Sequence, residues 1–237
     1  MLIESISRTH VGLRRKVNED SLLERPDLGL WVVADGMGGH DAGEIASAMI
    51  TNALSKAPAT HDLGASARWV EEALSDVNDE LISFARTGDR PRTIGSTVVG
   101  LRIEGPSFVA FWAGDSRAYR LRDGELSKLT HDHSLVQGLV DAGMLAPEDA
   151  ETHPQASVIT RAVGVARILS LEMVNGDVQS GDRFLLASDG LTRLVPDPEL
   201  CAALADGPLA PIADRLVETV LQRGAPDNVT LIIIAIA

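Results

Sequence analysis

The chain has 237 residues, is 45% hydrophobic, contains one cysteine and carries a formal charge of −13. These values predict a globular core in one large domain or two small ones, and they argue against a disordered chain. The acidic balance argues against nucleic acid as a partner, because binding a phosphate backbone requires a basic surface. The apolar runs are far shorter than the ~20 residues that span a bilayer, and the N-terminus lacks the pattern of a signal peptide. We therefore expect a cytoplasmic protein without membrane association.

Strand-like segments, rich in Val, Ile and Leu or alternating in polarity, recur along the chain. They are residues 2–9, 30–34, 96–103, 108–113, 118–122, 169–174, 183–187 and 229–236. Several are separated only by turn residues, such as "GPS" before Phe108 and "RDGEL" after Tyr119. Such short connections favour antiparallel hairpins over alternating strand–helix–strand units.

Helical periodicity is predicted over residues 42–56, 65–86, 134–142, 197–205 and 209–222. In the second of these segments Trp69, Ala73, Val77 and Leu81 are spaced by four residues, which places them on one apolar stripe. Antiparallel strand groups with amphipathic helices predict packed sheets that helices cover on the outside. Residues 131–164 interrupt the strand series and are too polar for a core, so we expect an ordered surface excursion of the kind that carries specificity.

Four aspartates adjoin apolar segments: Asp35 in "WVVADG", Asp115 in "FWAGDS", Asp189 in "FLLASDG" and Asp227 in "APDNVTLIII". The first three end predicted strands and the fourth begins one. Because the end of one antiparallel strand lies beside the start of its neighbour, all four can reach one sheet edge. Glu19 and Asp20 add an acidic pair after the first predicted strand.

Aspartate and glycine also mark ordinary turns after strands, which is the simpler interpretation of any one of these positions. Several carboxylates that converge repel one another and raise their pKa values, and bound divalent cations remove that cost. Oxygen ligands suit Mn²⁺ or Mg²⁺, whereas the scattered histidines and the lone Cys201 argue against zinc. Two such ions can orient a water molecule, lower its pKa and hold a phosphate oxygen.

The loop "DGMGGHDAGE" begins at Asp35. Asp41 and Glu44 have the spacing of a capping box at a helix start. The loop lacks the phosphate-loop pattern and any nearby lysine, which argues against nucleotide binding. His40 is either a general acid for the leaving alkoxide or an exposed loop histidine.

The basic run "RRK" at residues 14–16 also has two interpretations. It is either a solvated face or, beside an acidic metal site, the source of an arginine that holds a phosphoryl group by a bidentate fork. Competing chemistries fail on spacing. A cysteine phosphatase needs an arginine six residues after its cysteine, where Gly207 stands, and a serine hydrolase at "GDS" would have no histidine beyond His153 as its base.

Together these motifs resemble the metal-dependent serine/threonine phosphatases of the PP2C (PPM) family in their compact bacterial form. They run the length of the chain in order: "GLRRKVNEDS", "WVVADGMGGHDAGE", "TIGSTVV", "AGDSRAYRL", "LTHDHSLVQGLVDAGML", "HPQASVITRAVG", "LLASDGLT" and "APDNVTLIII". The resemblance implies an α+β fold, an αββα sandwich of two central, mostly antiparallel β-sheets flanked by helices. It also implies a single phosphatase domain over residues 1–237, with residues 131–164 as a flap subdomain.

The same resemblance assigns metal ligands. Asp35 would bridge two Mn²⁺ or Mg²⁺ ions and the Gly36 carbonyl would bind one, while Asp189 and Asp227 would bind the other. Asp115, with Asp189, would hold a weaker third ion.

Further roles follow from the resemblance for residues around the metals. Glu19 and Asp20 look like outer-shell groups that hold metal-bound waters. Arg15 matches the phosphate-binding arginine, and Arg14 is its less favoured neighbour.

Two positions depart from the family pattern. Many members have Arg-Asn where this chain has Ala156-Ser157, and in animal relatives the proposed acid histidine follows Asp-Gly directly. Here Met37 holds that place and His40 lies three residues further on.

The resulting hypothesis is hydrolysis of phosphoserine and phosphothreonine in proteins by a metal-activated water, opposing a bacterial serine/threonine kinase that acts on the same targets. One alternative is a partner-switching phosphatase that acts on an anti-anti-sigma-type phosphoprotein. Another is a catalytically silent binding module of the same fold, which the full set of carboxylates argues against.

Overall fold

The computed structural model describes residues 2–38, 42–86 and 93–237. Its strands are β1 (Ile3–His10), β2 (Asp20–Arg25), β3 (Leu30–Gly38), β4 (Ile94–Ser96), β5 (Val98–Glu104), β6 (Ser107–Ala113), β7 (Arg117–Arg122), β8 (Glu125–Lys128), β9 (Glu172–Asp177), β10 (Arg183–Ala187) and β11 (Val229–Ile236). Its helices are α1 (Ala42–Leu54), α2 (Leu63–Ala85), α3 (Leu135–Asp141), the 3₁₀ turn η1 (Pro147–Asp149), α4 (Asp189–Thr192), α5 (Asp197–Leu204) and α6 (Leu209–Gln222).

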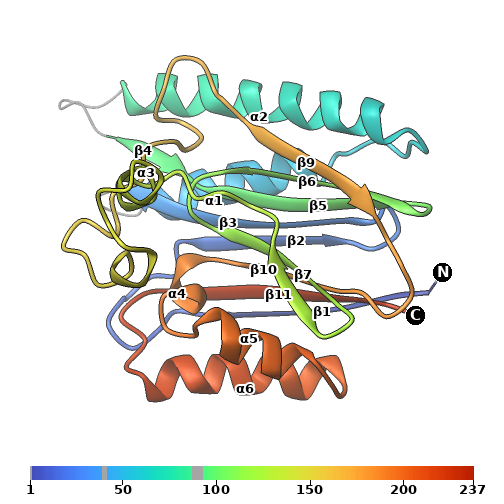
Figure 1. Ribbon diagram of the computed structural model, residues 1–237. Helices are drawn as coiled ribbons and strands as arrows, with labels where there is room; N and C mark the ends of the chain where they lie inside the picture. Colours follow the sequence, from blue (N-terminus) through green and yellow to red (C-terminus); the bar gives the residue numbers. More distant parts are fainter. Residues whose placement is uncertain (1, 39–41, 87–92) are drawn as a thin grey trace.

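The described strands form two stacked sheets with helices on both outer faces (Figure 1). One sheet has the order β1-β11-β10-β7-β8, and the other has the order β2-β3-β5-β6-β9, with β4 pairing beside β3. Each of these strand pairs is antiparallel. The helices α1 and α2 cover the second sheet, and α5 and α6 cover the first (Figure 1). The αββα sandwich expected from the sequence is confirmed.

The apolar run in β3 is continuous because both faces of this strand are buried. Leu30, Val32 and Ala34 pack in the cluster that includes α1 and α2. Trp31 and Val33, which point to the opposite face, pack between the two sheets. A strand in the middle of a four-layer sandwich therefore reads as an unbroken hydrophobic segment.

The C-terminal strand β11 has the same double burial in the other sheet. Val229, Leu231 and Ile233 contact the layer of α5 and α6, whereas Ile232 and Ile234 face the space between the sheets. Burying both faces of β3 and β11 fixes the ends of these strands firmly, and the acidic residues discussed below lie at those ends.

Four strands differ from the sequence expectation. The segment expected as one strand at 96–103 is divided, with β4 at Ile94–Ser96 and β5 at Val98–Glu104. Neither β2 nor β8 was expected, because "DSLLER" and "ELSK" are short and polar, and their strand conformation depends on pairing with β3 and β7. The strand predicted at 169–174 lies instead at Glu172–Asp177, opposite β6. Its turn-like Gly176 is there because a Cβ would lie 2.5 Å from the Phe108 ring.

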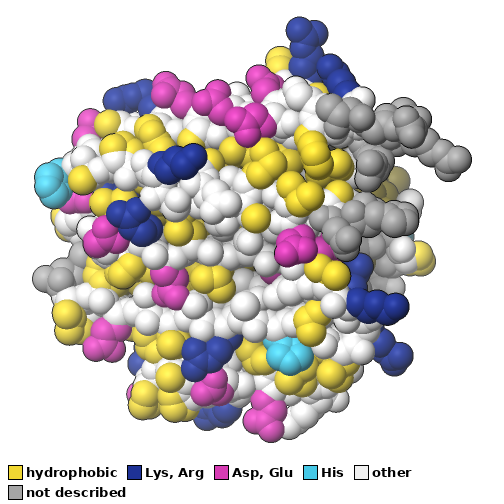
Figure 2. All heavy atoms as spheres, turned by 180° about the vertical axis from the view of Figure 1, so that it is seen from behind, with side chains coloured by type: hydrophobic (Ala, Val, Ile, Leu, Met, Phe, Trp, Pro, Cys, Tyr) yellow, Lys and Arg dark blue, Asp and Glu magenta, His cyan; other side chains and the backbone are white. Residues whose placement is uncertain are grey.

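The acidic excess of the chain lies partly on its surface. Figure 2 shows the molecule from behind, where acidic side chains border apolar ones along the upper rim. The exposed residues of α2 include Glu72, Asp76 and Glu80, which flank a groove floored by Trp69 and neighbouring apolar side chains of α1 and α2. A solvated acidic face and an acidic site therefore both contribute to the net charge.

Within the described ranges, the helices are too short or too polar to cross a bilayer.

Candidate metal and phosphate centre

Five aspartates from separate parts of the chain gather at one edge of the sandwich. Asp20 begins β2 and faces Asp35 across the β2–β3 pair. Asp115 follows β6, Asp189 follows β10, and Asp227 lies just before β11. Antiparallel pairing brings these strand ends and strand starts together, as the sequence predicted.

Electrostatic coupling shows that these carboxyl groups are neighbours. Burial raises the pKa of Asp35 well above its usual range, and repulsion from Asp20, Asp189, Asp115 and Asp227 raises it further. An ionised carboxylate with four like-charged neighbours, in a position only partly exposed to water, is unfavourable unless a cation compensates it.

The other buried members of the set respond in the same direction. Burial raises the pKa of Asp20 to about 7, and hydrogen bonds from Thr230 and Ser188 partly offset this rise. Burial also raises the pKa of Asp115 to about 8, with Asp189 adding repulsion. The pKa of Asp189 is raised by burial too, against the attraction of Arg193.

Two carboxylate oxygens in this centre are buried without a hydrogen-bond partner among the described residues. They are Oδ1 of Asp20 and Oδ1 of Asp115. The other oxygen of Asp20 accepts a 2.9 Å hydrogen bond from the Ser188 hydroxyl. Buried polar atoms normally have partners, so unpartnered oxygens mark places where a ligand outside the chain fits. An oxygen-only donor set of this kind fits Mn²⁺ or Mg²⁺.

Gly36 lies where the backbones of β3, α1 and the segment before β2 approach one another closely. The Gly36 N–H donates to the Glu19 carbonyl at 3.1 Å. A Cβ on Gly36 would lie 2.1 Å from the Gly43 carbonyl oxygen and 2.6 Å from that of Glu19. The Ser47 hydroxyl donates to the same Glu19 carbonyl at 2.6 Å. Only glycine, which has no Cβ, allows the backbone at position 36 to lie this close to the backbones of Gly43 and Glu19.

Arg15 reaches this centre from the opposite end of the chain. Its Nη2 donates to Oδ2 of Asp227 at 2.8 Å, and the other oxygen of Asp227 accepts from the Asn228 N–H at 2.8 Å. Arg14 and Arg15 are both exposed, and within the described residues it is Arg15 that pairs with a carboxylate of this centre. Arg15 is the arginine beside the carboxylates.

The carboxyl groups lie near one another but are spread along the edge. Across the described residues, no three His, Cys, Asp or Glu side chains are arranged to hold one metal together. One Asp227 oxygen accepts from Arg15 and the other from the Asn228 backbone. A cation at Asp227 would compete with the Arg15 guanidinium for the same carboxylate.

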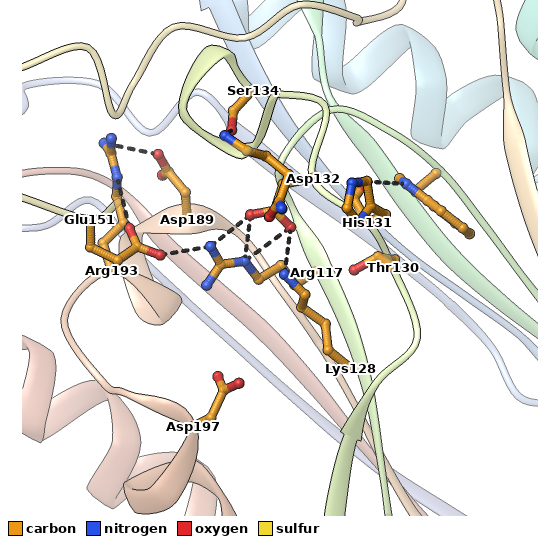
Figure 3. Close-up of polar contacts among 12 residues, drawn as sticks. Arg117, Lys128, Thr130, His131, Asp132, Ser134, Glu151, Asp189, Arg193 and Asp197 are labelled. Atoms are coloured by element: carbon orange, nitrogen blue, oxygen red, sulfur yellow. Dashed lines mark hydrogen bonds and ion pairs between the residues drawn. The ribbon is translucent and has the colours of Figure 1, made fainter. Parts of the chain in front are cut away.

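A group of residues that the sequence did not single out supports the centre. Asn228 donates to the carbonyls of Val11 and Val17 and accepts from the Glu19 N–H, so it ties the loop that carries Arg15 to β11. Asp132 accepts from Arg117 at 2.9 and 2.6 Å (Figure 3). Asn228 directly follows Asp227 in "DNVT", and Arg117 lies two residues after Asp115 in "GDSR"; this closeness to motif aspartates was the available signal.

The prediction for His40 lies outside the described residues, as does the Asp41 end of the expected capping box. Glu44, the other member of that box, lies in the first turn of α1.

Solved structures of bacterial serine/threonine phosphatases share this fold over the length of the chain. The chain belongs to the protein phosphatase 2C family, whose profile matches residues 12–230.

Similarity to named proteins extends over nearly the whole chain. It is 36% identical over 233 residues to the serine/threonine protein phosphatase PstP of Mycobacterium tuberculosis, covering 98% of this chain and 45% of PstP. The chain thus spans about half the length of that relative. It is also 34% identical over 235 residues to the serine/threonine phosphatase Stp of Listeria innocua, covering 96% of this chain and 93% of Stp.

Solved structures give the same family. PppA, described as a key regulatory component of T6SS in Pseudomonas aeruginosa, superposes with a TM-score of 0.91 at 42% identity, covering 99% of this chain and 98% of that one. The catalytic domain of PstP in complex with two manganese ions superposes with a TM-score of 0.88 at 34% identity, covering 98% and 97%.

Proposed function

We propose that this chain hydrolyses phosphoserine and phosphothreonine in proteins. The observation that carries the proposal is the gathering of five aspartates, with raised pKa values for Asp20, Asp35, Asp115 and Asp189, at one edge of a protein phosphatase 2C fold. A purely structural role would leave these like charges without compensation.

The residues present fit two Mn²⁺ or Mg²⁺ ions and a weaker third. Asp35 and the Gly36 carbonyl would hold the first ion, and Asp35, Asp189 and Asp227 the second. Asp115, whose Oδ1 is buried and unpartnered, would join Asp189 on the third. When bound, such ions lower the pKa of a water molecule and neutralise charge on a phosphoryl group.

Two outer carboxylates complete the arrangement. Asp20 has one oxygen fixed by Ser188 and one without a partner, so it can accept a hydrogen bond from a water molecule and orient it. Glu19 precedes Asp20 in the chain and would orient a water molecule in the same way. Its carboxyl group lies beside Gly43, since a Cβ added to Gly43 would be 2.4 Å from Glu19 Oε1.

Arg15 would bind the phosphoryl oxygens of the substrate. Its guanidinium is half-exposed, and it already bonds an anionic oxygen at this edge. A guanidinium can grip two oxygens of a phosphoryl group at once, which a lysine cannot do. Exchange of Asp227 for the phosphoryl group would leave Asp227 free to bind a cation. His40 remains our candidate for protonating the leaving alkoxide.

Residues 131–164 would form the flap of this single domain. A backbone bridge between Ser134 and Ile159 joins the two ends of the segment, and one between Ser96 and Val163 ties its C-terminal end to β4. At its other end, the His133 N–H donates to the Gly114 carbonyl at 2.9 Å. The flap therefore lies beside the acidic edge while its middle is made mostly of turns. We infer that the substrates are cytoplasmic phosphoproteins and that a serine/threonine kinase phosphorylates them.

The test is Mn²⁺-dependent release of phosphate from a phosphothreonine peptide. Asp189→Asn should lower kcat/KM at least about 100-fold, because it removes a charged ligand of the cations that would activate the water and stabilise the phosphoryl group. Asp79→Asn, an exposed position on α2, is the matched control and should retain wild-type activity. Full activity of Asp189→Asn would exclude the proposed site.

A further inference from the structure

Two hollows meet beside the acidic edge. A narrow cavity of about 30 Å³ is lined by Asp115 and Asp189 and extends toward the flap. A wider hollow of about 740 Å³ lies outside it. Arg117, Thr192 and Arg193 line both, and so does Glu151 of the flap. Whatever occupies this junction is therefore next to the proposed site of phosphate hydrolysis.

The two arginines at the junction are fixed by the body of the protein. Arg117, at the start of β7, is only 15% exposed and donates to Asp132 from both Nε and Nη2. Asp132 is itself buried and also pairs with Lys128 at 3.4 Å. Arg193 follows α4 and places Nη1 3.2 Å from Oδ2 of Asp189.

Glu151 is held between these two arginines, as Figure 3 shows. Its Oε1 accepts from Nη2 of Arg117 at 2.6 Å, and its Oε2 lies 3.9 Å from Nε of Arg193. The Glu151 side chain is 37% exposed and sits in a run of turns after η1. The Glu151 carboxylate lies on a turn, whereas other residues hold the two guanidinium groups in place. Glu151 is therefore the partner that a carboxylate from outside the chain can replace.

Thr192 adds an independent observation at the same junction. It is buried, it lines both hollows, and its Oγ1 has no hydrogen-bond partner within the described part of the chain. A buried hydroxyl without a partner is unusual and indicates that an acceptor from outside the chain fits there. The junction therefore offers two cationic groups and one free hydroxyl.

We propose that Arg117, Thr192 and Arg193 form a subsite for the carboxylate of an acidic side chain on the phosphoprotein substrate, and that Glu151 fills this subsite when no substrate is bound. The inference rests on the proposed phosphatase function and names a sequence preference of its substrates. Replacing one carboxylate by another leaves the charge balance unchanged, and each guanidinium has more donors than its existing partners use. Because the narrow cavity reaches Asp115 and Asp189, the acidic residue must lie close to the phosphorylated one.

The test uses the full chain with Mn²⁺ and a set of phosphothreonine peptides. Each peptide carries a single Glu, or Gln in its place, at one position on either side of the phosphothreonine. At one position we expect kcat/KM to be about fivefold higher for Glu than for Gln, mostly through KM, since a charge-assisted hydrogen bond is stronger than a neutral one.

Variants of the flap separate this subsite from a general charge effect. Glu151→Gln removes the internal competitor and should raise the Glu-to-Gln ratio about threefold further at that position. Glu148→Gln is the matched control, because Glu148 lines the outer hollow and, across the described residues, no ion pair joins it to either arginine. Its ratio should equal that of the wild type.

The outcomes distinguish this inference from the proposed function. Absence of turnover with every peptide would refute the phosphatase function itself. Turnover with equal rates for Glu and Gln at all positions would refute the subsite alone. An equal rise of the ratio in Glu148→Gln and Glu151→Gln would also refute it, because the effect would then reflect net charge. Thr192→Val, which keeps the shape and removes the hydroxyl, should lower the ratio.

Discussion

Asp20 and Asp35 are directly opposite each other in the antiparallel pairing of β2 and β3. Like charges at facing positions of a sheet destabilise it, and here both groups are also withdrawn from water. The pairing of Asp20 with Asp35 therefore lowers the stability of the fold at the edge where the motif aspartates gather. This is the pattern expected where function, rather than packing, determines residue identity.

Mn²⁺ should raise the melting temperature of the protein. At about 100 times the dissociation constant, a cation that binds only the folded state adds about 2.7 kcal/mol, which for a chain of this size corresponds to a rise of roughly 5–10 °C. Differential scanning calorimetry with EDTA or with Mn²⁺ measures the shift. Asp35→Asn should melt higher than the wild type in EDTA, because it removes a carboxyl group whose ionisation is opposed by burial and by its acidic neighbours, yet it should lose the Mn²⁺ response. An unchanged response in Asp35→Asn would remove Asp35 from the ligand set.

Stability in EDTA should fall as the pH rises from about 5 to about 8. The folded protein keeps protons on Asp20, with a pKa of about 7, and on Asp115, with a pKa of about 8, whereas the unfolded chain has already released them. The folded state thus binds more protons in this interval, and each extra proton lowers the unfolding free energy by about 1.4 kcal/mol per pH unit. Urea denaturation at a series of pH values measures the slope.

The control for this pH dependence is Asp115→Asn, which should reduce the slope by the contribution of one proton. Saturating Mn²⁺ should abolish the fall, because cation binding favours the deprotonated carboxylates. Stability in EDTA that rises between pH 5 and pH 8 would contradict the raised pKa values.

Gly36→Ala should destabilise the protein by about 2–3 kcal/mol, since overpacking in a tight core typically costs this much. The added Cβ would meet the Gly43 and Glu19 carbonyls, which are backbone atoms and cannot rotate away. Gly138→Ala is the matched control. Gly138 lies in α3 with open space around a Cβ, and its replacement should stabilise by about 0.5–1 kcal/mol. Thermal melts of the two variants should move in opposite directions.

The sequence was most informative where burial is double-sided. The runs in β3 and β11 could be recognised as strands because both of their faces are apolar. An aspartate next to such a run has its position fixed by the strand, and Asp35 and Asp227 were therefore predictable. Strand β2 was not, because "DSLLER" has no such run and becomes a strand only by pairing with β3.

Side-chain networks at the site could not be predicted in the same way. Arg117 and Asp132 are joined because the β7–β8 hairpin returns the chain to the same place, and Glu151 joins them through turns without a periodic pattern. Such contacts depend on tertiary geometry that local sequence does not encode.

Replacing Arg15 should test the assignment of the phosphate-binding residue. Arg15→Ala should lower kcat/KM for a phosphothreonine peptide about 100-fold, because removal of one stabilising donor from a transition-state site has this magnitude. The kcat/KM of Arg15→Lys should lie between those of the wild type and Arg15→Ala, since an ammonium keeps the charge but loses the two-pronged geometry of the guanidinium. Arg14→Ala is the matched control, because Arg14 is exposed like Arg15 but, within the described residues, no ion pair joins it to Asp227. Its activity should equal that of the wild type. The ion pair between Arg15 and Asp227 allows a second test, which measures Mn²⁺ affinity instead of activity. Freed from its arginine, Asp227 should bind Mn²⁺ at least as tightly in Arg15→Ala as in the wild type, as measured by calorimetric titration. Equal activity losses in Arg14→Ala and Arg15→Ala, or a loss of Mn²⁺ affinity that accounts for the loss of activity, would assign Arg15 to the support of the metal site instead of to phosphate.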